Sequence, residues 1–232
     1  MHGPAKGLLK TFWYPGFEKA SGGLLRERNL LECQAAHSPS TFLHQLGVRP
    51  ARGERVVSLF CYPHAPLVNL AQSLAHTPTL LLICGGQPLP FADMGQLRTQ
   101  VLPWLAQDDY DRLLWSCDLN LVRGEDSFVR AQWAARPMMW HIYAQDDGAH
   151  AAKLEAFLDL YLADSPATLA QAQRQQWLAW NALAPAPRLG QDLACLFDPA
   201  PALRWREKLL AQADLCTQLM QWVETNSQPC KP

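Results

Sequence analysis

Five short apolar runs, whose starts lie about 20 residues apart, constrain the fold of this chain more than any other feature. None of the runs alternates polar with apolar residues, which is typical of strands covered on both faces. Each gap between runs leaves room for one helix, which is the connection that parallel strands need. The spacing therefore predicts an α/β fold built on a parallel sheet. The expected strands are residues 56–60, 79–84, 100–102, 118–122 and 138–142.

Helical patterns occupy most of the gaps and continue beyond the last expected strand. In residues 149–162, for example, Leu154, Phe157, Leu158 and Tyr161 form the apolar stripe of one helix face. We expect no further strand after Asp164. The expected helices are residues 67–75, 108–116, 126–134, 149–162, 167–183 and 203–223.

The composition narrows the class of protein. With 49% hydrophobic residues the chain can bury a substantial core, which excludes disorder as its main state. Only 18% of residues are charged and the net charge is −1, so electrostatics favour neither nucleic acid nor an anionic membrane as a partner. No apolar stretch reaches the roughly 18 residues that span a bilayer. The seven cysteines include no CxxC pair, and we expect a soluble protein of the reducing cytoplasm.

The segment LNLVRGEDSFVRAQW (119–133) contains the strongest candidate for a ligand site. An expected strand ends there just before an expected helix begins, and such junctions bind ligands in open α/β sheets. A helix N-terminus favours phosphate, because its backbone N–H groups are free. Arg123 offers a forked guanidinium, Gly124 lets the backbone approach closely, and Ser127 offers a hydroxyl.

The acidic residues of this segment need a separate explanation, since a carboxylate repels phosphate. Glu125 is suited to accept hydrogen bonds from a sugar hydroxyl, as acidic residues do in dinucleotide sites. The alternative is that Asp126 or Ser127 simply caps the helix, with an ordinary surface ion pair beside it. Both interpretations stay open on the pattern alone.

Aromatic residues follow the expected strands and would lie at the same edge of the sheet. Phe60 and Tyr62 follow the first strand, and Trp104 follows the third, with Tyr110 close behind. Such rings can stack on a nucleobase, and each stacking contact is worth about 1–3 kcal/mol. The alternative for each ring is ordinary packing in the core.

Other motifs give weaker indications. His141 and His150 flank Asp146 and Asp147, but no HxH or HxxxH spacing is present, so we expect no metal. Cys84 precedes two glycines that we interpret as a turn rather than as part of a nucleophile motif. The aromatic segment FWYPGF (12–17) is either an exposed surface that meets a partner or a plug on the chain's own core.

Several longer segments resemble one family. They are TFWYPGFEKASGGLLRE (11–27), VSLFCYPH (57–64), the stretch 101–150 that contains RGEDSFVRAQWA and WHIY, and KLEAFLDLY (153–161). Together they resemble the bacterial elongation factor P maturation arginine rhamnosyltransferases, EarP. The resemblance implies a cytoplasmic glycosyltransferase of the GT-B type, with two facing Rossmann-like domains. Members transfer rhamnose from dTDP-β-L-rhamnose to an arginine of elongation factor P, with inversion and without a metal.

The resemblance also assigns residues, position by position. It implies a donor-binding site that holds the base between aromatic rings and the ribose and diphosphate on the RGEDS string, with Glu125 also serving the chemistry. Trp104 and Tyr110 replace phenylalanines of relatives, and we expect base binding to survive. The implied donor-binding residues are Phe60, Tyr62, Trp104, Gln107, Tyr110, Arg123, Gly124, Glu125, Asp126 and Ser127.

The family's N-terminal aspartate, its proposed general base, lies in a DNxGDIG-like turn that this sequence lacks. We therefore expect the chain to be the C-terminal portion of a family member and to be inactive alone. A separate N-terminal half is then a candidate partner. The expected domains are a remnant and linker (1–54), a nucleotide-sugar-binding Rossmann-like domain (55–200), and a C-terminal helix (201–232) that packs toward the N-terminal domain. The alternatives are a non-catalytic nucleotide-binding or protein-docking module and, more remotely, a nucleotide-sugar epimerase.

Overall fold

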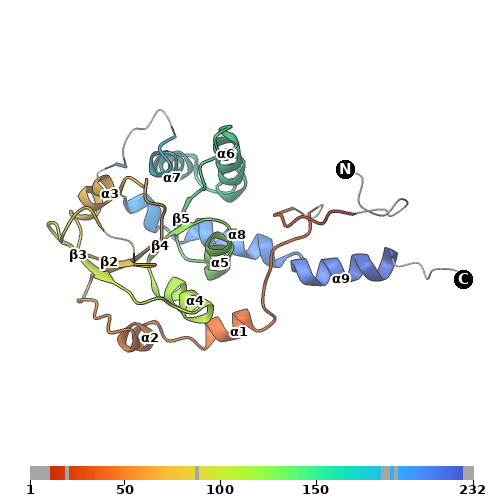
Figure 1. The fold of residues 1–232 in the computed structure, drawn as a ribbon, viewed down its shortest axis with the longest axis horizontal. Coiled ribbons are helices and arrows are strands. Elements are labelled where there is room, and N and C mark those ends of the chain that lie inside the picture. Colours follow the sequence, from red (N-terminus) through yellow and green to blue (C-terminus); the bar gives the residue numbers. More distant parts are fainter. Residues whose placement is uncertain (1–10, 19–20, 87–88, 184–188, 191–192, 227–232) are drawn as a thin grey trace, which may run out of the picture. The chain divides into compact units, whose positions relative to one another are not determined.

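A five-stranded parallel sheet forms the centre of the fold in the computed structural model, which describes residues 11–18, 21–86, 89–183, 189–190 and 193–226 (Figure 1). The strand order is β3-β2-β1-β4-β5, and every neighbouring pair is parallel. This confirms the predicted Rossmann-like α/β fold. The strands are β1 (Arg55–Leu59), β2 (Thr79–Ile83), β3 (Leu97–Val101), β4 (Leu119–Arg123) and β5 (Met138–His141).

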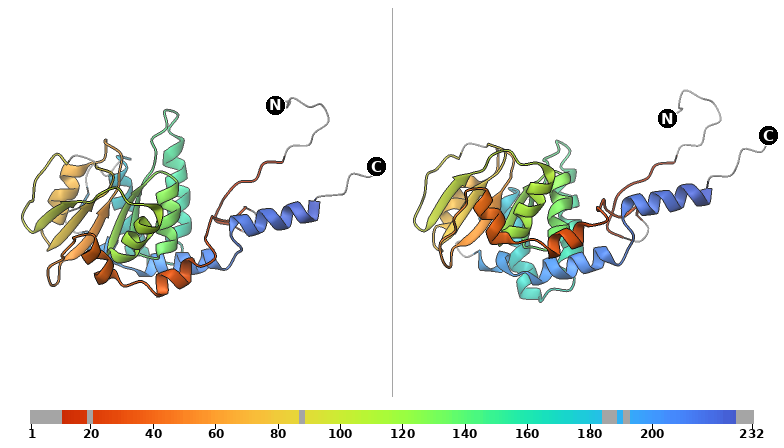
Figure 2. Two further views of the ribbon diagram at one scale, coloured as in Figure 1. Left: turned by 60° about the horizontal axis from the view of Figure 1, so that its bottom comes forward. Right: turned by 90° about the horizontal axis from the view of Figure 1, so that it is seen from below.

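Helices connect the strands and cover both faces of the sheet. α2 and α4 lie on one face, and α3 and α7 on the other (Figures 1 and 2). The helices are α1 (Leu30–Ala35), α2 (Pro39–Gln45), α3 (Leu67–Leu74), α4 (Gln107–Ser116), α5 (Asp126–Ala134), α6 (Ala149–Tyr161), α7 (Ala167–Trp180), α8 (Ala200–Leu210) and α9 (Leu215–Asn226), with a 3-10 helix η1 (Ala194–Phe197).

The prediction of one helix over residues 203–223 is wrong, because the chain breaks between α8 and α9. The Asp214 carboxylate accepts hydrogen bonds from the backbone N–H of Thr217 (3.1 Å) and from its hydroxyl (2.6 Å). A side chain that binds the N–H three residues later starts a new helix. α1 and α2 were not anticipated either, and they occupy part of the segment expected to be a linker.

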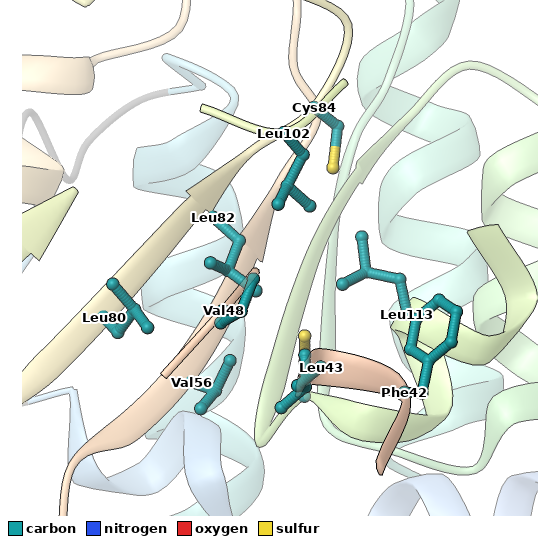
Figure 3. Packing of buried hydrophobic residues seen from close by; sticks show 10 residues of the cluster. Phe42, Leu43, Val48, Val56, Leu80, Leu82, Cys84, Leu102 and Leu113 are labelled. Atoms are coloured by element: carbon teal, nitrogen blue, oxygen red, sulfur yellow. The ribbon is translucent and has the colours of Figure 1, made fainter. Parts of the chain in front are cut away.

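The continuous apolar runs are explained by burial on both sides of the sheet. Every residue of β2 is buried, and on one face Leu80 and Leu82 pack with Val56 of β1. Side chains of α2 and α4, including Phe42 and Leu113, close this cluster (Figure 3). Burying an apolar side chain of this size contributes about 1.5–3 kcal/mol, so the sheet positions its carboxyl edge on a rigid core.

Two sets of buried polar side chains tie the strands and helices around the sheet together. The Ser58 hydroxyl donates to Asn120 Oδ1 (2.6 Å), and Asn120 Nδ2 donates to the Leu114 carbonyl (3.0 Å), which ties β1 to β4 and to α4. Arg130 of α5 forms a two-pronged ion pair with Asp111 of α4, in which Nε lies 2.6 Å from Oδ1 and Nη2 contacts Oδ2. Both side chains are less than a tenth exposed.

The chain divides into two compact units, residues 29–206 and residues 1–28 with 207–232. In the smaller unit the Leu215 N–H donates to the Leu24 carbonyl (2.9 Å), and the rings of Trp13 and Trp222 lie 5.8 Å apart. Phe12 and Tyr14 are exposed, so the aromatic segment FWYPGF is partly packed and partly open. Residues 1–10 of the predicted remnant lie outside the described residues. The origin of residues 1–54 and the packing of the C-terminal helix stay predictions.

Two further properties concern the whole described chain. The cysteines that the structure describes, namely Cys33, Cys61, Cys84, Cys117, Cys195 and Cys216, are free thiols, whereas Cys230 lies outside that part. None of the described helices has the length and apolar character required to cross a membrane.

Asp111→Asn should destabilise the unit of residues 29–206 by about 3–5 kcal/mol, because it removes the negative charge that pairs with the buried Arg130 guanidinium. Asp109→Asn, on the same helix, is the matched control. Its pair with Arg112 is about half exposed, so the loss should be about 0–1 kcal/mol. Urea unfolding measures both, and equal losses would show that the buried pair has no special weight.

Candidate functional site

The candidate site lies at the carboxyl edge of β1, β4 and β5, which are neighbours in the sheet. Leu59 pairs with Leu121, and Arg123 pairs with His141. The residues that follow β1 therefore lie next to the junction between β4 and α5. This register brings Phe60 and Tyr62 next to Arg123, which is distant from them in the sequence.

Arg123 is the centre of the site. Its Nη1 donates to the Cys61 carbonyl (3.0 Å), and its guanidinium carbon lies 4.1 Å from the centroid of the Phe60 ring and 5.2 Å from that of Tyr62. Ring faces attract a cation, so both rings hold the guanidinium in place. One terminal nitrogen is used by Cys61, and the rest of the fork is suited to phosphate oxygens.

Gly124 makes the close approach of Tyr62 possible. Its φ is +64°, a conformation that favours glycine, and an added Cβ would lie 3.1 Å from the Tyr62 hydroxyl. The Trp140 indole N–H donates to the Gly124 carbonyl (2.7 Å), which fixes the turn from the side of β5. Burial raises the pKa of Tyr62 above its ordinary value, opposed by the charge of Arg123. Tyr62 therefore presents a neutral hydroxyl.

The alternative interpretation, that Asp126 or Ser127 simply caps α5, is wrong for the described chain, in which no side chain makes a capping hydrogen bond to this helix. The Ser127 hydroxyl instead contacts the Arg123 carbonyl and accepts from the Arg123 N–H (3.1 Å). Ser127 is buried, while Glu125 and Asp126 are exposed at the start of the helix. The first-turn N–H groups of an α-helix have no partner within the helix, so this end is suited to bind an anion.

Among the predicted aromatics, Phe60 and Tyr110 pack partly against the core cluster, and Phe60 also contacts Arg123. The ring of Tyr110 meets the ring of Phe60 edge to face at 6.0 Å, and burial raises the pKa of Tyr110. Trp104 is 79% exposed, so its ring is open to a ligand rather than buried in the core. Gln107 is exposed at the first residue of α4.

Gly85 is a part of the site that the sequence analysis interpreted only as a turn. The turn is confirmed, with a φ of +73° at Gly85. A Cβ there would lie 2.8 Å from the Phe60 ring and 3.8 Å from Trp104. The glycine therefore leaves room for Phe60 and keeps the space beside Trp104 open. No signal in the sequence connected this turn with the ends of β1 and β3, which are followed by Phe60 and Trp104.

His141 is the second residue that the sequence analysis missed in this role. Its Nδ1 accepts the Tyr62 N–H (3.1 Å), and its ring centroid lies 5.5 Å from that of Tyr62. The Nδ1 atom of His141 is therefore occupied by a hydrogen bond inside the site. His150 likewise accepts the Gln145 N–H at its own Nδ1 (3.1 Å). No three His, Cys, Asp or Glu side chains within the described ranges could hold a metal ion. The available signal for His141 was its position near the end of the strand expected at 138–142.

Comparison with known proteins identifies the family. Residues 1–224 match the model of the elongation factor P (EF-P) rhamnosyltransferase EarP. The chain belongs to the EarP family. It is 46% identical to a protein-arginine rhamnosyltransferase of Pseudomonas aeruginosa, over 94% of this chain and 64% of that protein. Its identity to the Pseudomonas putida enzyme is 42%, over 92% of this chain and 63% of that protein.

A solved structure described as the structural basis for EarP-mediated arginine glycosylation of translation elongation factor EF-P is also similar. It is 36% identical, with a TM-score of 0.78, and the match covers 94% of this chain and 77% of that chain. The predicted family and fold are thus confirmed. The chain spans a little under two thirds of the length of the two EarP relatives from Pseudomonas.

Proposed function

We propose that the carboxyl edge of this sheet binds the nucleotide sugar dTDP-β-L-rhamnose, and that the chain supplies the donor-binding half of a GT-B arginine rhamnosyltransferase acting on EF-P with inversion. The observation that carries the proposal is the arrangement around Arg123. A guanidinium that contacts the faces of two rings lies beside the N-terminus of α5. The relatives' activity and the family match support the sugar and the acceptor.

The diphosphate is the leaving group of the proposed reaction. As the bond from the sugar's anomeric carbon to the phosphate oxygen breaks, negative charge grows on that oxygen. Arg123 and the backbone N–H groups at the start of α5 are positioned to stabilise this charge before it forms, which lowers the barrier. Glu125, exposed at the same helix end, is suited to accept hydrogen bonds from the hydroxyls of the donor.

The acceptor side needs a group that these residues do not supply. A charged guanidinium is a poor nucleophile, so a carboxylate must orient or deprotonate it. In an inverting transfer the nucleophile attacks from the face opposite the leaving group. Glu125 lies beside the proposed diphosphate position, which is the wrong face. We propose that the part of the longer relatives that this chain does not span provides the carboxylate and positions EF-P.

Arg123→Ala should weaken the binding of dTDP much more than that of thymidine. The variant removes a charge-assisted contact to phosphate, worth about 1.5–3 kcal/mol, and leaves the stacking rings in place. Isothermal titration calorimetry with both ligands measures the difference. Arg98→Ala is the control, because Arg98 pairs with Glu54 at the opposite edge of the sheet. Equal losses for dTDP and thymidine would contradict the role of Arg123.

Trp104→Ala should weaken thymidine and dTDP alike, by about 1–3 kcal/mol, since it removes a stacking face. Trp104→Phe should cost little. The same titrations test this prediction, and thermal unfolding without ligand is the control. Since Trp104 is 79% exposed, stability should hardly change. Unchanged dTDP affinity in Trp104→Ala would remove this ring from the site.

The chain alone should not rhamnosylate EF-P, because general-base help contributes typically 10²- to 10⁴-fold and the acceptor would not be positioned. Mass spectrometry of EF-P after incubation with dTDP-rhamnose measures the product, with the full-length P. aeruginosa relative as the positive control. Addition of a separately made N-terminal half should restore some transfer. A rhamnose adduct formed by the lone chain would contradict the proposed division of roles.

The same reagents separate the remaining alternatives. A protein-docking module would bind EF-P but not dTDP, and the exposed rings of Phe12 and Tyr14 are the feature that favours it. An epimerase would convert the sugar of dTDP-rhamnose without any change in the mass of EF-P. Binding of dTDP in calorimetry therefore supports the donor site and counts against pure docking.

A further inference from the structure

His141 is buried at the end of β5. It touches groups on both sides of the turn that joins β4 to α5, which begins at Arg123 and is called the Arg123 turn below. His141 is 1% exposed. Its ring lies 4.7 Å from that of His64 and 5.3 Å from that of Trp180, measured between centroids. None of the roles proposed above uses this imidazole.

The hydrogen bond of His141 determines its proton arrangement. Nδ1 accepts the Tyr62 N–H, so in the neutral ring the proton must be on Nε2. Burial, together with the charges of His64 and Arg123, lowers the pKa of His141 to about 3. The ring is therefore neutral near pH 7, and Nδ1 stays available as an acceptor.

This hydrogen bond crosses over one strand of the sheet. β1 and β5 are not neighbours, because β4 lies between them. The bond from Tyr62, after β1, to His141, in β5, therefore spans the end of β4, where Arg123 and Gly124 begin the turn into α5. It holds the segment that supplies both the Cys61 carbonyl to Arg123 and the Tyr62 ring to the guanidinium.

The end of β5 is itself fixed on its outer side. Asn181, which follows α7, accepts the Ile142 N–H at Oδ1 (2.9 Å) and donates from Nδ2 to the Trp140 carbonyl (2.9 Å). These two bonds flank His141 and replace those of a further strand. Trp140 in turn donates to Gly124. The contacts of β5 thus hold both sides of the Arg123 turn.

We propose that His141 is a positioning residue of the donor site, whose Nδ1 holds the segment after β1 over the Arg123 turn so that Tyr62, the Cys61 carbonyl and Arg123 keep the geometry that receives a nucleoside diphosphate. The inference rests on the proposed function, because it assumes that this edge binds dTDP. It goes beyond that function by assigning the arrangement to a residue outside the proposed donor-contacting set.

Two substitutions separate positioning from simple packing. His141→Leu keeps an apolar side chain but has no acceptor for the Tyr62 N–H. His141→Asn is smaller, but its side-chain oxygen takes the place of Nδ1. If the hydrogen bond is what matters, His141→Leu should weaken dTDP roughly 5- to 50-fold, as expected for an unsatisfied amide, whereas His141→Asn should stay within about threefold of the unchanged protein.

Amide hydrogen exchange, measured without nucleotide, gives a readout of the hydrogen bond itself. Exchange at Tyr62 should be slow in the unchanged protein and in His141→Asn, and faster in His141→Leu. His37→Leu is the control, because His37 bonds to the Ser116 hydroxyl (2.8 Å) at the far end of α4. This variant should lose stability but leave both dTDP affinity and Tyr62 exchange unchanged.

The outcomes distinguish this inference from the proposed function. If the unchanged protein does not bind dTDP, the proposed function fails, whatever the exchange data show. If it binds dTDP and His141→Leu binds equally well, or if Asn and Leu weaken binding to the same extent, the positioning role of His141 is overturned. Rescue by Asn in both affinity and exchange supports it.

Discussion

The parallel pairing of β4 between β1 and β5 is the constraint on which the candidate site depends. Because all three strands run in the same direction, the chain leaves each of them at one edge of the sheet. Arg123 then lies opposite His141 and beside the segment after β1. The core of β2, α2 and α4 supports this edge, because the rings of Phe60 and Tyr110 pack against it. A shift of the register of β4 by one residue would reverse the side of the sheet on which Arg123 projects.

The electrostatics of the edge follow from how Arg123 is held. Within the part of the chain that the structure describes, its partners are a carbonyl oxygen and two ring faces, none of which carries a full negative charge. The neighbouring imidazole of His141 is neutral. A cation placed in this way is oriented without being neutralised, and the adjacent start of α5 favours an anion for the same reason. The site is therefore suited to a diphosphate, with Trp104 open for a base.

Four of the five described strands, and most helices, could be predicted from the sequence because burial on both faces leaves uninterrupted apolar runs of strand length. The third strand, expected at 100–102, is β3 (Leu97–Val101) at the edge of the sheet, where only Leu97 is buried. The failures have local causes. The break before α9 depends on the hydrogen bonds of one carboxylate, Asp214, within an otherwise continuous helical pattern. α1 and α2 are six and seven residues long, too short to show a clear period. Neither the hydrogen bonds of a single carboxylate nor a helix of six or seven residues changes the average composition of the segment that contains it.

The sequence by itself determined the parallel α/β architecture and the family, and it placed Arg123 and Gly124 at the end of a strand. These properties depend on local patterns and on matched segments. Only the tertiary structure showed that Gly85 makes room for the Phe60 ring, that Ser127 binds the backbone of Arg123 rather than capping α5, and that His141 holds Tyr62. The Ser127 contact depends on the conformation of the turn after β4, whereas the contacts of Gly85 and His141 join residues from different strand ends. Their distances depend on strand order and register, which the spacing of apolar runs does not specify.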